Sequence, residues 1–192
     1  MRRTLKFFIW PVLVLVIGGA LWFAATSPLL QWRQPVYIAA GFAGVVGLAL
    51  MLVQPMLAAR ALPGVQAATS RRWHRRTGGA IVRAVVVHVA GLWITSPPDV
   101  IDALTFTSAT PFSAWGVIGM WGLFAAAGLA AYRRRLRFSP KVWKWVHKGL
   151  ASGVILCTIL HVIPIDGTME PVTKMVLLIC LTTATAWALQ RA

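Results

Sequence analysis

Long runs of apolar residues, separated by short polar segments, dominate the chain from end to end. Each run is close to the ~20 residues that a helix needs to cross a hydrocarbon core about 30 Å thick. The runs cover residues 5–25, 36–57, 71–95, 112–132, 142–165 and 172–189. The pattern predicts an all-α, polytopic membrane protein built as a bundle of six transmembrane helices. The first run exceeds the ~7–15 apolar residues of a signal peptide, so we expect a retained helix.

Composition agrees with this prediction. The chain is 58% hydrophobic and only 12% charged, whereas about 25% charged residues is usual in soluble proteins. At 192 residues we expect one domain, over 1–192. Cys157 and Cys180 lie inside apolar runs and form no CxxC motif, which favours small buried apolar residues over a disulfide framework.

Basic residues give the chain a net charge of +15, and their placement predicts its orientation. With six crossings, four basic clusters fall on one side of the membrane: Arg2, Arg3 and Lys6; Arg60, Arg71, Arg72, Arg75 and Arg76; Arg133, Arg134, Arg135, Arg137, Lys141, Lys144 and Lys148; and Arg191. The opposite side holds Arg33, Lys174 and all four acids, Asp99, Asp102, Asp166 and Glu170. The positive-inside rule then places both termini in the cytoplasm of a multi-pass protein of the cell (inner) membrane. This distribution argues against nucleic acid as a partner.

The four histidines form two pairs with the same spacing. His74 and His88 lie fourteen residues apart on the third run, and His147 and His161 lie fourteen apart on the fifth. Fourteen residues is close to four helical turns, so both rings of a pair face nearly the same side, about 21 Å apart along the axis. Beyond these pairs we find no internal repeat in the sequence.

Two helices with such pairs can hold two haems, one above the other. The third and fifth helices run in the same direction, so His74 and His147 lie near the inner face and His88 and His161 near the outer face. We therefore predict two b-type haems with bis-histidine ligation, the inner iron on the first pair and the outer iron on the second. Zinc needs three or four ligands close together, which the spacing does not offer. Four histidines so arranged also disfavour a purely structural role.

Arg83 lies inside the third run, five residues before His88. An unpaired arginine at membrane depth is costly, so we predict a haem propionate as its bidentate partner. Snorkelling or a backbone carbonyl partner is the alternative. The outer acids Asp99, Asp102, Asp166 and Glu170 are weak candidates for cation contact, and solvated loop charges are the simpler interpretation.

With these residues in place, the chain resembles the ferric reductase-like transmembrane domain family. That family includes ferric reductases, NADPH oxidases and the haem-binding membrane subunit of the periplasmic methionine sulfoxide reductase system, and its core is six helices with histidines on the third and fifth. The matching segments are RRWHRRTGGAIVRAVVVH and VWKWVHKGLASGVILCTILH. The resemblance covers about residues 5–189 and implies a membrane electron-transfer component.

The branches of this family differ in ways that bear on function. The four-histidine pattern favours the two-haem ferric reductase and oxidase branch, since the methionine sulfoxide reductase subunit lacks the inner histidine equivalent to His74. Members of the two-haem branch continue into a flavin- and nicotinamide-binding domain. Here the chain ends at Ala192 without a GxGxxG motif, so we expect a separate donor or a truncated longer chain.

The leading hypothesis is therefore a di-haem cytochrome b that passes electrons from a cytoplasmic donor to an outer acceptor such as ferric iron or oxygen. The donor would be a flavoprotein with FAD or FMN, or another reductant, and whether the chain is itself an enzyme stays open. The alternative is a membrane subunit that delivers electrons to a periplasmic partner such as a methionine sulfoxide reductase. A non-redox transporter is disfavoured because the helices lack intramembrane acids and broken segments.

Overall fold

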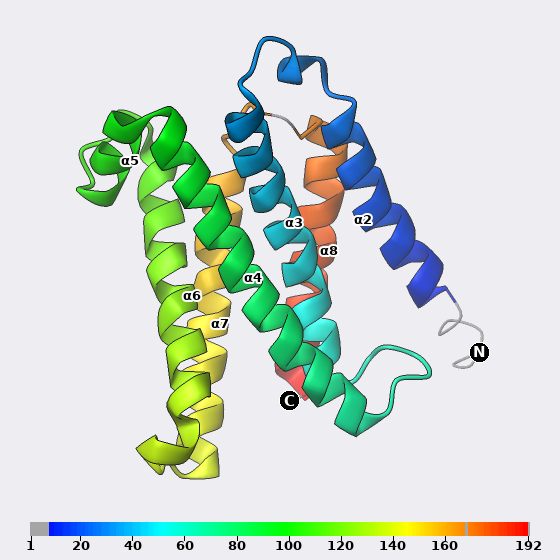
Figure 1. Ribbon diagram of the computed structural model, residues 1–192. Helices are drawn as coiled ribbons and strands as arrows, with labels where there is room; N and C mark the ends of the chain where they lie inside the picture. The colour runs from blue at the N-terminus through cyan, green and yellow to red at the C-terminus, as the bar shows by residue number, and fades with distance from the viewer. Residues whose placement is uncertain (1–7, 168, 192) are drawn as a thin grey trace. The chain divides into compact units, whose positions relative to one another are not determined.

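The computed structural model describes residues 8–167 and 169–191, which form helices, turns and loops and no strand. The helices in chain order are α2 (Ile9–Ala25), η1 (Pro28–Leu30), α3 (Pro35–Ala58), α4 (Ala67–Thr95), α5 (Pro97–Leu104), α6 (Pro111–Leu136), α7 (Pro140–Val162) and α8 (Pro171–Arg191) (Figure 1). The start of the first predicted run, with Arg2, Arg3 and Lys6, lies outside the described residues.

Proline and small polar residues begin most of these helices. Proline occupies an early position in α3, α5, α6 and α7, where its fixed φ suits the first turn and its missing N–H costs nothing. Ser139 caps α7 by accepting a hydrogen bond from the Val142 N–H at 3.3 Å. Arg137 ends α6 in the left-handed region, with a φ of 48°.

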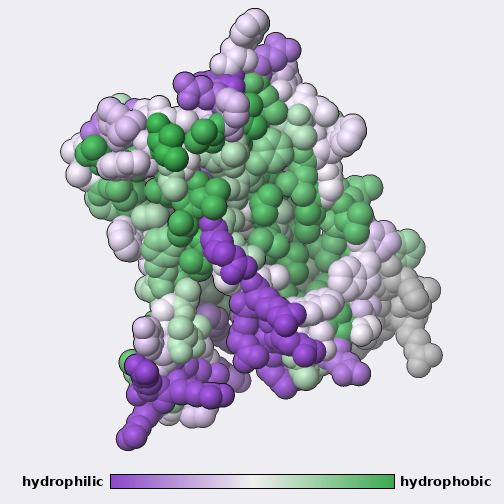
Figure 2. All heavy atoms as spheres, viewed as in Figure 1, coloured by the Kyte–Doolittle hydropathy of each residue, from purple (hydrophilic) through white to green (hydrophobic). Residues whose placement is uncertain are grey.

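Five of the described helices are long and apolar enough to cross a membrane: α3, α4, α6, α7 and α8. The apolar helix α2 has 17 residues, at the lower limit of the ~17–25 residues of a spanning helix. The all-helical, multi-pass membrane protein is thus confirmed, while the count of six crossings and the side of the termini stay predictions. Figure 2 shows hydrophilic residues gathered around the first turns of α4 and at the end where α6 meets α7.

The chain divides into two compact units. Unit 1 comprises the described residues up to Gly91 and those from Asp166 onward; unit 2 comprises Leu92–Ile165. In unit 1, α8 packs against α2 and α3. Its core is aliphatic and includes Leu48, Leu52, Leu177 and Leu181.

A fully buried serine secures the turn between α3 and α4. The Ser70 side chain is 0% exposed, and its hydroxyl donates to the Leu57 carbonyl at 2.7 Å. That carbonyl lies in the last turn of α3, where carbonyls have no partner within the helix. Ser70 thus fixes the first turn of α4 beside the end of α3.

Unit 2 is built on the antiparallel pair α6 and α7, which lie side by side along their length (Figure 1). Val117 on α6 and Val154 and Cys157 on α7 are buried in this pair. The short helix α5 contacts α6, and it occupies a segment that the sequence indicated only as an outer loop.

Candidate functional site

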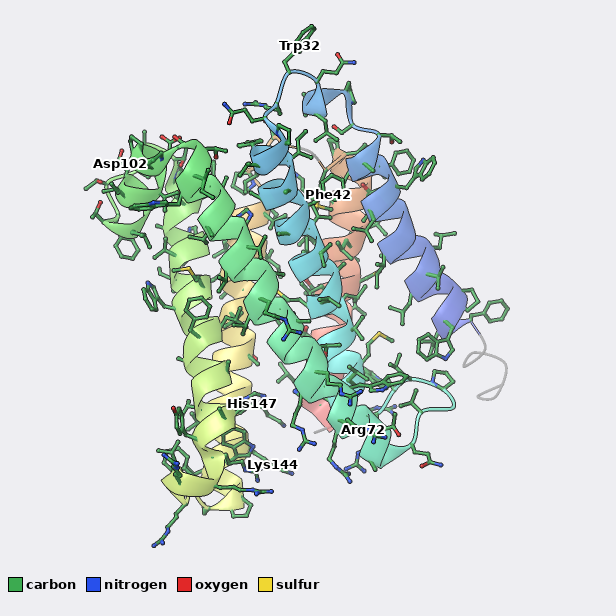
Figure 3. All side chains as sticks on the ribbon, viewed as in Figure 1. Trp32, Phe42, Arg72, Asp102, Lys144 and His147 are labelled. Atoms are coloured by element: carbon green, nitrogen blue, oxygen red, sulfur yellow. The ribbon has the colours of Figure 1, made fainter. Side chains whose placement is uncertain are left out.

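The four histidines lie where the sequence predicted them along their helices. His74 and His88 are on α4 in unit 1, and His147 and His161 are on α7 in unit 2. Figure 3 shows His147 near the beginning of α7, with Lys144 one turn before it. All four side chains are half-buried, so each ring is partly packed against its own unit and partly accessible.

The ring of His88 is held by the backbone of the preceding helix. Its Nδ1 atom lies 2.7 Å from the Ala40 carbonyl oxygen of α3. A carbonyl can only accept, so the proton of a neutral ring must be on Nδ1. The lone pair is then on Nε2, which is the atom left to bind a metal.

His161 is held in the same way within unit 2. Its Nδ1 atom donates to the Phe112 carbonyl oxygen of α6 at 2.8 Å. The Phe112 ring also contacts it, with the two ring centroids 5.9 Å apart and the planes tilted by 60°. Here too the free lone pair is on Nε2.

A glycine one turn beyond each carbonyl makes room for the imidazole. A Cβ atom added at Gly44 of α3 would lie 3.1 Å from the Nδ1 of His88, and one added at Gly116 of α6 would lie 2.7 Å from the Nδ1 of His161. Both are closer than ordinary van der Waals contacts. We call each set of a carbonyl and a glycine four residues later a histidine seat: Ala40 with Gly44, and Phe112 with Gly116.

The two histidine seats belong to helical hairpins that share one register. Ala40 and Phe112 are 72 residues apart, as are Gly44 and Gly116, whereas His88 and His161 are 73 apart. The same register continues one turn further, where Gly47 faces Ala84 in the first hairpin and Gly119 faces Cys157 in the second. The pairs α3–α4 and α6–α7 therefore present one arrangement twice, although no repeat is evident in the sequence.

His74 has a different setting from His88. Its Nδ1 atom lies 3.3 Å from the Gln54 carbonyl oxygen, so this bond is long compared with 2.7 Å for His88. The Gln54 side-chain amide donates in return to the His74 carbonyl at 3.2 Å. A Cβ atom added at Gly78 would lie 3.1 Å from the Gln54 amide nitrogen, so the absence of a side chain at Gly78 leaves room for the Gln54 amide.

His147 is supported by an aromatic side chain of its own helix. The Trp143 ring, one turn earlier, stacks on the imidazole with centroids 5.2 Å apart and planes 13° from parallel. The guanidinium carbon of Arg133 lies 4.7 Å from the centroid of the Trp143 ring. This contact was not predicted from the sequence, although the i, i+4 spacing of two aromatic rings was a usable signal.

Other residues of these helices lie apart from these contacts. Arg83 is exposed on α4, whereas its neighbour Ala84 faces Gly47 of α3. Gly79, Gly149 and Gly153 are open, with nothing within 4 Å of an added Cβ. Lys174, predicted to face the outer side, lies in the first turn of α8 and is 6% exposed.

Three of the four acidic residues accept local hydrogen bonds in the segments around the helices. Asp99 accepts a hydrogen bond from the Ser96 hydroxyl at the start of α5. Asp102 accepts one from the Thr107 hydroxyl at 3.4 Å. Glu170 precedes α8 and accepts from the N–H groups of Val172 and Thr173 at 2.9 and 2.8 Å, and these bonds, that of Thr173 first, lower the pKa of its carboxyl group.

Comparison with known families decides the assignment of the chain. The model of the ferric reductase like transmembrane component family matches residues 43–158, more than half of the sequence. The chain belongs to this family. The matched segment includes His74, His88 and His147, as well as the glycine of each histidine seat, and it ends just before His161. Comparisons with curated proteins and with solved structures give no significant match. The family predicted from the histidine segments is thus confirmed.

Proposed function

We propose that this ferric reductase-like protein is a transmembrane di-haem b-type cytochrome. His74 and His147 would ligate the inner haem iron, and His88 and His161 the outer one. The observation that carries the proposal is the matched hydrogen bonding of the outer histidines. Both donate Nδ1–H to a backbone carbonyl, at 2.7 and 2.8 Å, and so keep Nε2 for the metal. Such bonds to the second ring nitrogen are typical of metal-binding histidines.

The residues of the chain then do three things for the cofactor. The carbonyls of Ala40 and Phe112 select the tautomer and orient the rings. The four histidines would supply two imidazole ligands to each haem iron, a ligand set that would suit electron transfer better than oxygen activation. Bound haem supplies a one-electron Fe(III)/Fe(II) couple whose potential depends on ligands, hydrogen bonds and burial. Arg83, exposed five residues before His88, is the candidate partner of a propionate.

The proposed direction of electron flow follows from the basic clusters. With six crossings and cytoplasmic termini in the cell (inner) membrane, His74 and His147 lie on the donor side and His88 and His161 on the acceptor side. The donor would be a cytoplasmic flavoprotein carrying FAD or FMN, or another reductant. The acceptor would be ferric iron, oxygen or a periplasmic redox protein.

One observation favours an alternative, a membrane subunit serving a periplasmic oxidoreductase such as a methionine sulfoxide reductase. The outer histidines have matched histidine seats, whereas His74 has a long bond to Gln54 and His147 stacks on Trp143. A protein that holds only the outer haem would need only the matched pair. Copurification of a periplasmic partner with the chain would support this alternative.

The first test is a dithionite-reduced minus oxidised visible spectrum of the purified protein, with haem quantified per chain. Two low-spin b-type haems support the proposal, and one haem supports the alternative. A protein that contains no haem after expression with ample haem supply refutes both.

Single substitutions then test the ligand pairs. His74→Ala and His147→Ala should each remove the inner haem, and His88→Ala and His161→Ala should each remove the outer haem. A redox titration identifies which haem is lost by its midpoint potential. If one substitution from each pair leaves both haems in place, the assignment of ligands is wrong.

A further inference from the structure

We propose that Gly44 and Gly116 are positioning residues for the outer haem, which would make each outer ligand depend on one glycine of the preceding helix. The inference rests on the proposed function. It starts from the two histidine seats, in which a backbone carbonyl holds Nδ1 and a glycine one turn later faces the same ring.

The space at each glycine is already filled by the imidazole. An added Cβ at Gly44 would lie 3.1 Å from Nδ1 and 3.2 Å from Cε1 of His88. At Gly116 the corresponding distances to His161 are both 2.7 Å, and Cγ is at 3.2 Å. A side chain at either position must therefore displace the ring, by more at Gly116 than at Gly44.

Any displacement of the His88 or His161 ring also moves its Nε2 atom. The carbonyl that holds Nδ1 lies on the same helix as the glycine, one turn away, so a ring pushed off the glycine also lengthens or bends that hydrogen bond. Because the imidazole is rigid, its Nε2 atom moves too. At metal sites, loss of the hydrogen bond that orients a ligating histidine typically lowers metal affinity by about 10- to 100-fold.

The chain offers matched controls on the same two helices. A Cβ at Gly47 of α3 would meet only the Ala84 Cβ, at an ordinary 3.7 Å, and a Cβ at Gly128 of α6 would meet nothing within 4 Å. Alanine is favoured over glycine inside a helix. Gly47→Ala and Gly128→Ala should therefore fold at least as well as the wild type and keep both haems unchanged.

The experiment compares Gly44→Ala and Gly116→Ala with these two controls. Haem per chain, the two midpoint potentials and the low-spin EPR signals are measured in the purified proteins. We expect Gly116→Ala to lose the outer haem and Gly44→Ala to bind it at least ~10-fold more weakly or with a shifted EPR signal. The inner haem should keep its potential in both, which a general loss of packing would not allow.

A second pair of variants removes the steric conflict and so guards against failure to fold. In His161→Gly, free imidazole should occupy the vacated seat and restore the low-spin outer haem. In His161→Gly combined with Gly116→Ala, the added methyl group meets no ring. Restoring the spectrum of this double variant should nevertheless need an imidazole concentration at least ~10-fold higher than in His161→Gly alone. Equal rescue in the two proteins overturns the inference.

The outcomes also separate this inference from the proposed function. A wild-type protein without haem overturns both. Wild-type haem content together with unchanged spectra and potentials in Gly44→Ala and Gly116→Ala overturns only the positioning role. Loss of both haems together in these variants, with normal controls and equal imidazole rescue, overturns it as well, because the effect is then not confined to the outer site.

Discussion

Replacement of Trp143 by leucine tests whether the inner ligand depends on its stacking partner. In the structure the Trp143 and His147 rings are 5.2 Å apart and nearly parallel, and Arg133 lies 4.7 Å from the Trp143 ring. Leucine keeps the apolar character and the helix propensity of the position. It removes both ring contacts, so His147 should lose the surface that sets the angle of its imidazole.

The magnitude follows from the two contacts. An aromatic pair of this geometry contributes about 0.5–1.5 kcal/mol beyond its buried area. If this energy holds the His147 ring in its binding orientation, its loss weakens inner haem binding by roughly 2- to 12-fold, since 1.4 kcal/mol corresponds to a factor of ten. The Arg133 contact adds about 0.5–1 kcal/mol to the placement of the indole itself, so Arg133→Gln should show a smaller effect in the same direction.

The assay is the transfer of haem from the purified protein to excess apomyoglobin, with the inner and outer haems distinguished by their midpoint potentials. Trp145→Leu is the matched control, because Trp145 is two residues away and 74% exposed. We expect faster loss of the inner haem in Trp143→Leu and wild-type behaviour in the control. Equal loss rates in the two variants, or a faster loss of the outer haem, would refute the reasoning.

Two further predictions concern stability. Ser70→Ala should lower the free energy of unfolding by about 0.5–1.5 kcal/mol, because it removes a buried hydrogen bond to the Leu57 carbonyl, which keeps its bond from the Arg60 N–H; thermal unfolding in detergent measures this, and a melting temperature equal to that of the wild type would contradict it. Glu170→Gln should be less stable than the wild type at pH 7, because hydrogen bonds from Thr173 and Val172 lower the pKa of the Glu170 carboxyl group. The sign is set by that lowered pKa: the advantage is present above the unfolded value of about 4.3 and is lost as pH falls through the folded pKa, so a stability difference that grows on acidification would contradict the assignment.

The long helices were predictable because a spanning helix needs an apolar run of sufficient length. The residues at which these helices end were less predictable. The sequence placed the end of the fourth run at 132, where arginines begin, but α6 continues to Leu136. Arginine is a good helix former, so hydropathy changes before the backbone does. The helix α5 was missed because its eight residues, with Val100 buried, are too few and too mixed to give an apolar run.

The site was predictable only in part, for a related reason. Spacing along one helix places His74 and His88 on nearly one face, and this needs no knowledge of neighbouring helices. What holds the rings of His88 and His161 comes from segments 48 and 49 residues away, at Ala40 and Phe112. Contacts of that separation depend on how the helices pack. Gly44 and Gly116 did not stand out in the sequence either, because they are two of its 16 glycines.

The use of main-chain carbonyls in the histidine seats has a consequence for how this site can evolve. Ala40 and Phe112 supply the same atom while bearing side chains of very different size. The hydrogen bond itself sets no requirement on the side chain, but other contacts do: Ala40 is buried and packs against Gly91, and the Phe112 ring contacts His161. A substitution at position 40 or 112 therefore disturbs these packing contacts while leaving the acceptor atom in the chain. Because each acceptor is a main-chain atom, no side-chain replacement at position 40 or 112 can delete it, and the bond is lost only when the backbone of α3 or α6 moves relative to the ring.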